Sequence, residues 1–307
     1  MPKAAPFTRK PGIEKLPLAV RKDIRDSYES EKEGFETTIS ELLGTPFHVN
    51  VNAGEVWAYN LPDSNMSAGG ILKGYVEGFI DALKDYVERY GEEGKTHFND
   101  AVTQSELTVN VNELGDEAET ISADIKDGVF RILFHHQKMG YNQSDLKEFL
   151  LKAVEDVPRA GLSITAKNSI EEDYNEQIEE LTKEIGEIIA MPDVILDPNF
   201  EENYAALDAV MKDKDWHWGF GRATFQYFSE GLKYQLNSQG FKDDDMLQEG
   251  LAEYLQSKTF KIRVVPQTKN DDIIETVLEG GVVYIQMTAQ NWWYNTGDAG
   301  SGLIDLL

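Results

Sequence analysis

The aromatic residues carry the clearest chemical signal in this sequence. Four of the five tryptophans lie in two short segments of the second half, 216–218 and 291–295, and the second segment also holds a tyrosine and two asparagines. Indole rings beside side-chain amides are typical of a site that stacks on a flat ring and hydrogen-bonds its edges. The alternative, that these rings complete a hydrophobic core or an interface, stays open. The ligand-binding residues we predict are Trp216, Trp218, Trp292, Trp293, Tyr294 and Asn295.

Acid–base chemistry would depend on two histidines and two glutamates. His135 and His136 are adjacent in a predicted strand, where neighbouring side chains point to opposite faces, so they are not expected to share a metal ion. Glu77 and Glu230 each lie in a predicted helix and are followed by glycine. These four residues are weak candidates for catalytic groups. Surface histidines and ion-paired glutamates are the alternative interpretation.

No cofactor or metal motif accompanies these residues. The chain has no cysteine, which excludes disulfides, thiolate zinc sites, thiol catalysis and cysteine-ligated iron–sulfur clusters. The glycines at 219 and 221 lack the preceding strand and the third glycine of a dinucleotide fingerprint. The glycine-rich stretch 297–302 lacks the lysine of a phosphate loop. We therefore predict no metal ion and no cofactor.

The overall charge restricts the class of partner. The 307 residues include 55 Asp and Glu against 29 Lys and Arg, a formal net charge of −26. This charge repels phosphate backbones and anionic lipid surfaces, so a small molecule is a better candidate partner than a nucleic acid or a membrane. Because 41% of the residues are hydrophobic and no apolar run approaches about 18 residues, we expect a soluble cytoplasmic protein. An oligomer is left open.

The first 20 residues differ from the rest of the chain. Four basic residues stand against one acidic residue, and four prolines accompany them. Proline fixes one backbone torsion and lacks an amide donor, so residues 1–20 are predicted to form an extended basic arm. No apolar segment of about 7–15 residues follows the basic ones, so no secretory signal is predicted. Either a frayed terminus or docking on an acidic surface fits this composition.

The elements that would position the candidate residues occur twice along the chain. The segment 128–132 matches 281–285 in its pattern of glycine and apolar residues, and Tyr141-Asn142 matches Tyr294-Asn295 at the same separation of 153 residues. Earlier in the chain the separation is 146 residues, so a seven-residue insertion is expected near 211–218. Two copies of one fold must keep the same spacing of apolar residues even where their other residues differ. Two unrelated halves of similar composition are the alternative.

Each copy is predicted to contain a helix, a strand, two helices and three strands. Apolar residues at spacings of three and four predict the first helix, and in the second copy Ser169 and Glu172 would form a capping box at its start. Short connections make the last three strands antiparallel neighbours, with Gly128 and Gly281 in tight turns. The elements expected are 21–43, 47–51, 68–90, 95–104, 106–112, 119–125 and 128–134, then 168–190, 194–196, 222–238, 244–256, 259–265, 272–278 and 281–287.

These elements define the predicted fold class and domain organisation. The class is α+β, a tandem duplication of a helix–strand–helix–helix–three-strand unit that forms a pseudo-twofold, two-domain chain. The arm over 1–20 is followed by a first α+β repeat over 21–155, a linker over 156–166 and a second repeat over 167–307.

Three functions fit this sequence. The first is a soluble intracellular binding protein for a small polar or aromatic ligand at the Trp-rich site of the second repeat. The second is an enzyme, a hydrolase or isomerase, with a cleft between the repeats and His135 or His136 as a catalytic group. The third is an assembly protein whose tryptophans anchor an interface. Without a catalytic motif, the first and third hypotheses are favoured, and whether the chain is an enzyme is left open.

We predict that the full chain does not bind duplex DNA or anionic lipid vesicles at physiological salt, because its net charge of −26 opposes their approach. Electrophoretic mobility shift and vesicle co-sedimentation measure this directly. Micromolar binding to either would contradict the prediction, unless a chain lacking residues 1–20 lost that binding.

Overall fold

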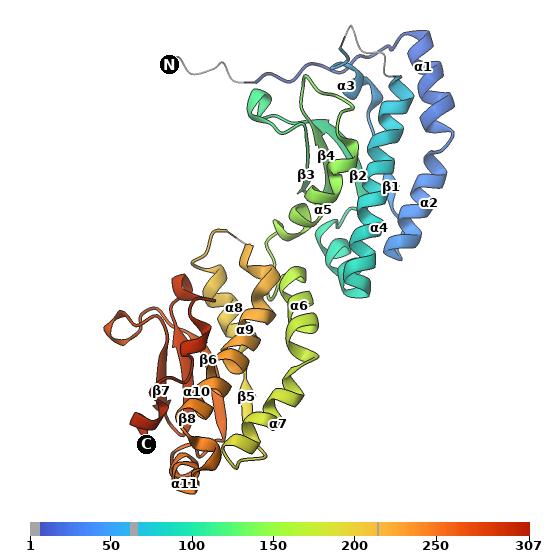
Figure 1. Ribbon diagram of the computed structural model, residues 1–307. Coiled ribbons are helices and arrows are strands. Elements are labelled where there is room, and N and C mark those ends of the chain that lie inside the picture. The colour runs from blue at the N-terminus through green and yellow to red at the C-terminus, as the bar shows by residue number, and fades with distance from the viewer. Residues whose placement is uncertain (1–6, 62–66, 214) are drawn as a thin grey trace, which may run out of the picture. The chain divides into compact units, whose positions relative to one another are not determined.

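The computed structural model describes residues 7–61, 67–213 and 215–307, which divide into two compact units (Figure 1). The first unit ends at Arg159 and the second begins at Ala160. Each unit contains helices and one four-stranded mixed sheet, so the chain is a mixed α/β protein. Within the described ranges, no helix is both long enough and apolar enough to cross a bilayer.

The first unit follows the predicted order of elements closely. Its longest helix, α4, holds the two helices predicted over 68–90 and 95–104: the non-helical backbone of Gly91, with a φ of +56°, separates them by a kink. The sequence predicts neither α3, which is a single short turn of helix, nor α5. The helices are α1 Leu18–Ile24, α2 Lys32–Leu43, α3 Ala53–Trp57, α4 Ala68–Ala101 and α5 Leu146–Glu155, and the strands are β1 His48–Val49, β2 Glu106–Val111, β3 Ile121–Lys126 and β4 Val129–Phe134.

The second unit has a similar order of elements, with α9, α10 and α11 where the first unit has α4, and with 3₁₀ turns after its last strand where the first unit has α5. Asp244 begins α11 by accepting the amide hydrogens of Met246 and Leu247, so the aspartate run at 243–245 marks a helix start. The sequence does not predict α8. The helices are α6 Ile164–Ile170, α7 Ile178–Ile188, α8 Phe200–Asp208, α9 Phe220–Gln226, α10 Lys233–Ser238 and α11 Asp245–Tyr254, and the strands are β5 Ile195–Asp197, β6 Thr259–Val264, β7 Glu275–Glu279 and β8 Val282–Met287.

The two sheets have the same strand order, β1-β2-β4-β3 and β5-β6-β8-β7. In the first, β4 pairs parallel to β2 and antiparallel to β3; in the second, β8 pairs parallel to β6 and antiparallel to β7. The prediction that the last three strands are successive antiparallel neighbours is therefore wrong for β2 and β3. The reason is burial: β4 buries Phe130, Ile132 and Phe134 and takes a central position, whereas β3 buries only Ile121 and lies at the edge.

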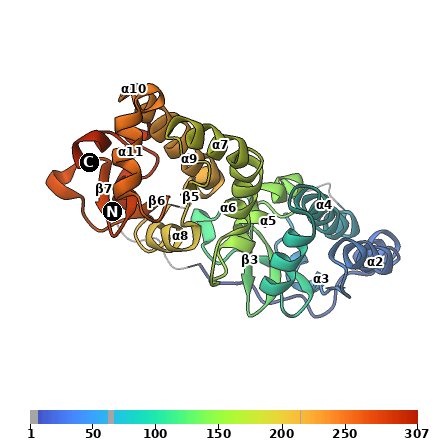
Figure 2. The same cartoon turned by 90° about the horizontal axis from the view of Figure 1, so that it is seen from below.

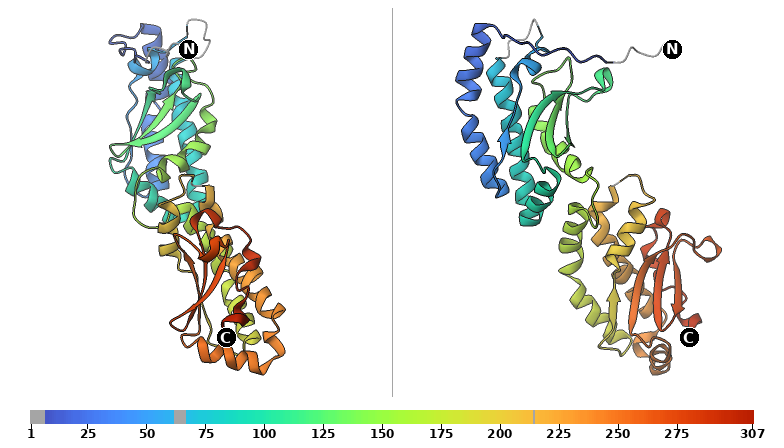
Figure 3. Two further views of the ribbon diagram at one scale, coloured as in Figure 1. Left: turned by 90° about the vertical axis from the view of Figure 1, so that its left-hand side faces the viewer. Right: turned by 180° about the vertical axis from the view of Figure 1, so that it is seen from behind.

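One face of each sheet is covered by helices in two layers (Figures 1 and 3). In the first unit α4 lies between the sheet and the pair α1 and α2, and Phe79 and Phe98 of α4 pack on Phe130 of β4 with ring centroids 4.9 and 6.0 Å apart. In the second unit α9 and α10 take this place, with α6 and α7 outside them (Figure 2). The remaining sheet face is polar: Arg131 pairs with Asp124 across β3 and β4.

The second unit begins with a helix that starts earlier than predicted. Ser163 accepts the amide hydrogen of Ala166, so α6 begins at Ile164 and not at 168. Ser169 and Glu172 therefore do not form a capping box. Ser169 lies inside the helix, where its hydroxyl donates to Asp173 at 3.0 Å and accepts from the Gly221 amide at 3.0 Å.

Several irregular features recur at fixed separations in the two units. A π-helical segment occupies Arg25–Glu29 in the first unit and Glu171–Asn175 in the second, 146 residues later. π-helical segments are rare, so this coincidence is informative. Residues with positive φ also recur, 153 residues apart. These pairs are Ser105 and Lys258, Asp127 and Gly280, Gly128 and Gly281, Gly140 and Trp293, and Asn142 and Asn295.

In each unit, a buried tyrosine of the helix beneath the sheet forms a hydrogen bond with the loop that follows the last strand. The Tyr75 hydroxyl accepts the Gly140 amide hydrogen at 2.7 Å, and the Tyr227 hydroxyl accepts the Trp293 amide hydrogen at 2.7 Å. Both phenol rings are fully buried. A glycine further along the same helix lets the loop approach closely: a Cβ on Gly78 would lie 2.3 Å from the Gln143 carbonyl oxygen.

The described part of the predicted basic arm lies on the first unit. The Lys10 amide donates to the Tyr59 hydroxyl at 2.7 Å, the Ile13 amide donates to the Gly54 carbonyl at 3.0 Å, and Arg9 forms an ion pair with Glu55. Residues 7–17 are therefore held by their own unit, and α1 begins within the range predicted for the arm. The first six residues of the arm lie outside the described residues.

Replacing Gly78 by Ala should lower the free energy of unfolding by about 1–3 kcal/mol, because the new methyl group meets a backbone carbonyl that cannot move freely. Gly34 is the matched control: it lies in α2 with no atom within 4 Å of a new Cβ. Gly34→Ala should stabilise the protein by about 0.4–1 kcal/mol. Urea denaturation followed by circular dichroism measures both, and equal effects of the two substitutions would contradict this packing.

Candidate functional site

The predicted aromatic residues come together at one end of the second sheet. Segment 215–219 forms a short 3₁₀ turn before α9, and Trp292 and Trp293 lie in the loop that follows β8. Phe220 joins the two segments, because its ring lies 5.6 Å from that of Trp216 and 5.5 Å from that of Trp292. This loop leaves the carboxyl end of the parallel pair β6 and β8, the edge where open α/β sheets commonly bind ligands.

Trp216 and Trp292 belong to the hydrophobic core of the unit. Their exposed fractions are 6% and 7%, and Trp292 stacks on Phe220 and meets Tyr227 edge-on at 5.5 Å. Their indole nitrogens have no hydrogen-bond partner among the described residues. These two rings therefore support the site from beneath and do not present a surface to a ligand.

Trp218 and the partly buried Trp293 form the outer part of the cluster. Trp218 is 51% exposed, and the two rings meet edge-to-face with centroids 5.1 Å apart. Trp293 packs against Gly219, where an added Cβ would lie 2.3 Å from the indole ring. The Arg222 guanidinium lies 5.7 Å from the centre of the Trp218 ring. We call these two rings and Arg222 the tryptophan surface.

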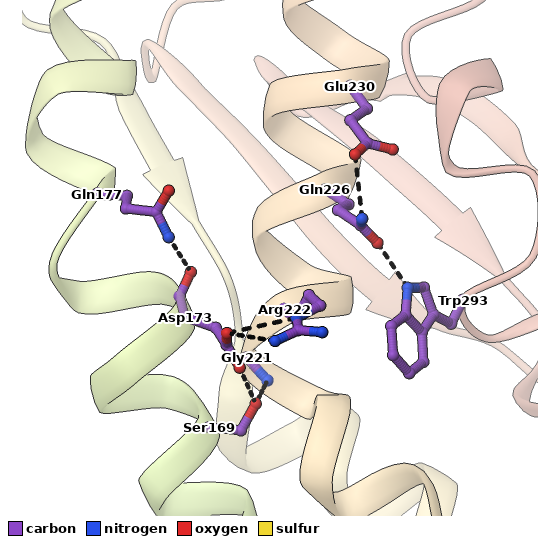
Figure 4. Close-up of polar contacts among 8 residues, drawn as sticks. All are labelled: Ser169, Asp173, Gln177, Gly221, Arg222, Gln226, Glu230 and Trp293. Atoms are coloured by element: carbon purple, nitrogen blue, oxygen red, sulfur yellow. Dashed lines mark hydrogen bonds and ion pairs between the residues drawn. The ribbon is translucent and has the colours of Figure 1, made fainter.

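A polar network holds the tryptophan surface in place (Figure 4). The Trp293 indole donates to the Gln226 side chain at 2.6 Å, and the Gln226 amide donates to Glu230 at 3.0 Å. Arg222 donates to Asp173 on the neighbouring helix at 3.1 Å. The sequence analysis missed Arg222, Gln226 and Asp173, because ordinary polar residues on helices give no signal until the helices and the loop are packed together.

Trp293 occupies a backbone conformation that is unfavourable for its residue type. Its φ is +63°, in the left-handed region where a bulky side chain is rare. The residue 153 positions earlier, Gly140, has φ +84°. Non-glycine residues in such sparsely populated regions cost about 1–3 kcal/mol and cluster at binding and catalytic sites. The tertiary contacts of the indole ring and the Tyr227 hydrogen bond keep Trp293 in this conformation.

The two remaining predicted ligand residues lie on the surface beside these rings. Tyr294 is 60% exposed, and Asn295 is exposed with a φ of +54°. The Asn295 backbone carbonyl accepts the amide hydrogen of Asp298, which forms the turn that follows. Tyr294 extends the exposed aromatic area next to Trp293 in the chain.

His135 and His136 lie side by side, contrary to the prediction that they point to opposite faces. Strand β4 ends at Phe134, so the strand alternation no longer applies, and the two imidazole rings stack with centroids 4.6 Å apart at 19°. One ligand atom from each histidine and one from Asp116 lie within 4.8 Å of one another. Burial, and next the neighbouring His136, lower the pKa of His135, which favours its neutral form.

Glu77 and Glu230 lie on exposed helix faces. Lys73 lies 3.6 Å from Glu77 one turn earlier, and Glu230 accepts the hydrogen bond from Gln226. These contacts match the ion-paired alternative. Glu230 is nevertheless part of the network behind Trp293 (Figure 4).

His217 is the chemically most suggestive side chain in the core. Its ring nitrogens contact the Ser163 hydroxyl at 3.0 Å and the Tyr204 hydroxyl at 3.3 Å, and only 1% of the residue is exposed. A serine and a histidine at this distance resemble a nucleophile and its base. Because no substrate reaches a fully buried imidazole, we assign these three residues to the support of the 3₁₀ turn that carries Trp218.

A separate open groove of about 600 Å³ lies beside α2 and β1 in the first unit. Three glutamates line it, and His48 lies at its edge. It contains none of the residues predicted as ligand-binding or catalytic. Comparison with known proteins does not indicate a function: no family model matches the chain, and no curated protein or solved structure shows a significant match.

Replacing Trp292 by Ala should lower the free energy of unfolding by about 3–5 kcal/mol, because it leaves a cavity beneath Phe220. Trp218→Ala removes a half-exposed ring and one edge-to-face contact, so it should cost only about 0.5–1.5 kcal/mol. Thermal and urea denaturation measure both variants. Similar losses for the two would show that the assignment of core and surface rings is wrong.

Proposed function

We propose that the second unit is a binding module for an uncharged ligand with a flat ring, which stacks on the tryptophan surface. The observation that carries this proposal is the left-handed backbone of Trp293, a strained position occupied by the largest side chain and fixed by hydrogen bonds at both its amide and its indole nitrogen. Strained backbone positions persist only where the surrounding structure holds them, and they cluster at binding and catalytic sites.

The charges around the surface favour an uncharged ligand. Arg222 is already paired with Asp173, and Glu230 is engaged by Gln226, so no free cation remains among these residues to bind a phosphate or carboxylate. The chain as a whole carries −26, which repels anions further. A ring with polar edges gains stacking energy on the indoles without a charge to desolvate.

We also infer that the two units are copies of one ancestral unit. The same strand order, the equal register of β2 on β4 and of β6 on β8, and the recurring π-helical and positive-φ positions support this. The buried tyrosines Tyr75 and Tyr227 lie 152 residues apart, and the glycines Gly78 and Gly231 lie 153 apart. The separation thus grows by one residue between these two pairs, and the π-helical segment Tyr227–Leu232 accommodates that extra residue. The other residues of the seven-residue insertion lie before this segment.

The duplication strengthens the functional proposal because it shows where the second copy departs from the first. Met139 and Gly140 of the first copy correspond to Trp292 and Trp293, and Trp218 lies in the added segment. The departures thus converge on one end of one sheet. A glycine suffices to build the loop in the first copy, so the loop itself does not require an indole at this position.

Titration of the full chain with neutral nucleobases, nucleosides and uncharged indole or phenol derivatives, followed by tryptophan fluorescence, should identify at least one class that quenches or shifts the emission. A ligand at 100 times its Kd should also raise the free energy of unfolding by about 2.7 kcal/mol. Trp218→Ala and Trp293→Gly should both abolish the response. Trp293→Gly installs the residue of the first copy, so the loop should keep its conformation.

Tyr234→Ala is the matched control, since Tyr234 is an exposed aromatic residue of the same unit on α10. It should leave binding unchanged. Equal loss in Tyr234→Ala and Trp218→Ala would indicate non-specific stacking and overturn the proposal. Concentration-dependent mass that is lost in Trp218→Ala, with no response to any ligand class, would instead make this surface a protein interface.

A further inference from the structure

The first unit carries its own chemical cluster at the corresponding end of its sheet. His135 and His136 follow β4 directly, and Asp116 lies in the short turn between β2 and β3. One ligand atom from each of the three lies within 4.8 Å of the others. The residues at the histidine positions of the second unit are Thr288 and Ala289. The cluster is therefore specific to the first unit.

The spacing within the cluster suits metal coordination better than a hydrogen bond. His136 Nε2 lies 3.4 Å from Asp116 Oδ1. Charged hydrogen bonds between such groups are shorter, about 2.7–2.9 Å. Two ligands bound at about 2.0–2.1 Å to one tetrahedral ion lie about 3.3 Å apart. The two imidazole rings stack with centroids 4.6 Å apart, and one ligand atom from each lies within 4.8 Å of the other and of an Asp116 oxygen.

The environment of the histidines adds a second observation. His136 Nδ1 is buried and has no hydrogen-bond partner among the described residues. Phe7 packs on this ring at 5.2 Å and also covers Gly115 beside Asp116. His135 is 5% exposed, whereas the Asp116 side chain is largely exposed. The cluster is thus shielded on the histidine side and open to water on the aspartate side.

We propose that Asp116, His135 and His136 form a three-ligand site for a divalent cation of the zinc class, with water completing the coordination. Two imidazoles and one carboxylate select borderline transition metals over Mg²⁺ and Ca²⁺, which prefer sets of oxygen ligands. The proposal is independent of the tryptophan surface, since the two clusters belong to different units and share no residue.

Loading the site has a consequence for the backbone of Gln137. Its amide donates to His135 Nδ1 at 3.1 Å. A cation bound at Nδ1 occupies that lone pair, and a cation bound at Nε2 requires the proton to reside on Nδ1. In either case the Gln137 amide loses its acceptor, so its resonance should shift on metal binding.

The test is calorimetric titration of the full, chelator-treated chain with Zn²⁺ in the presence of millimolar Mg²⁺. The Mg²⁺ occupies non-specific sites among the 55 acidic residues. One Zn²⁺ should bind per chain, and Asp116→Asn and His136→Asn should each weaken binding by about tenfold or more. Asp116 is exposed, so its variant keeps the fold even where the histidine variant does not.

His48→Asn is the matched control, because His48 is an exposed histidine of the same unit that lies 4.0 Å from Glu36. It should bind Zn²⁺ as the unaltered chain does, and the Gln137 amide resonance should shift in both. Zn²⁺ binding that Mg²⁺ abolishes, or that is equal in all three variants, would overturn the proposal. So would stoichiometric binding that leaves the Gln137 resonance in place.

Discussion

Both candidate sites depend on one buried contact, the hydrogen bond from a loop amide to a tyrosine hydroxyl in the helix beneath the sheet. In the first unit Tyr75 holds Gly140, and in the second Tyr227 holds Trp293, each at 2.7 Å. Burial raises the pKa of both phenols above the usual value, so the hydroxyls stay protonated. Each amide belongs to a residue with positive φ, a backbone conformation that is unfavourable for most residue types. The hydrogen bond to the tyrosine therefore stabilises the loop at its least favourable position.

The parallel pairing of the central strands decides where these loops lie. With β4 beside β2 and β8 beside β6, the carboxyl ends of two strands meet at one edge of each sheet. Side chains that follow the strands then converge without neighbouring each other in sequence. This edge carries two histidines and an aspartate in the first unit and the pair Trp218 and Trp293 in the second, so the two proposed sites occupy the corresponding edge of two sheets with the same strand order.

Two adjacent tryptophans of the aromatic cluster occupy different environments. Trp292 is buried against Phe220, while Trp293, the next residue, turns outward because its φ is positive. Gln226 accepts the hydrogen bond of the Trp293 indole and limits the rotation of that ring.

The apolar periodicity of the sequence was sufficient to place most helices and strands within a few residues, since burial of one face dictates that pattern. It also located the aromatic segments, but whether a given tryptophan is core or surface depends on packing, which only the tertiary structure decides. The strand order also depends on packing: β4 buries three side chains on one face and lies in the centre of the sheet, whereas β3 buries only Ile121 and lies at the edge. His135 and His136 were assigned to opposite faces because the end of β4 is invisible in the sequence: the strand stops at Phe134 where its pairing partners end, and pairing is a long-range property.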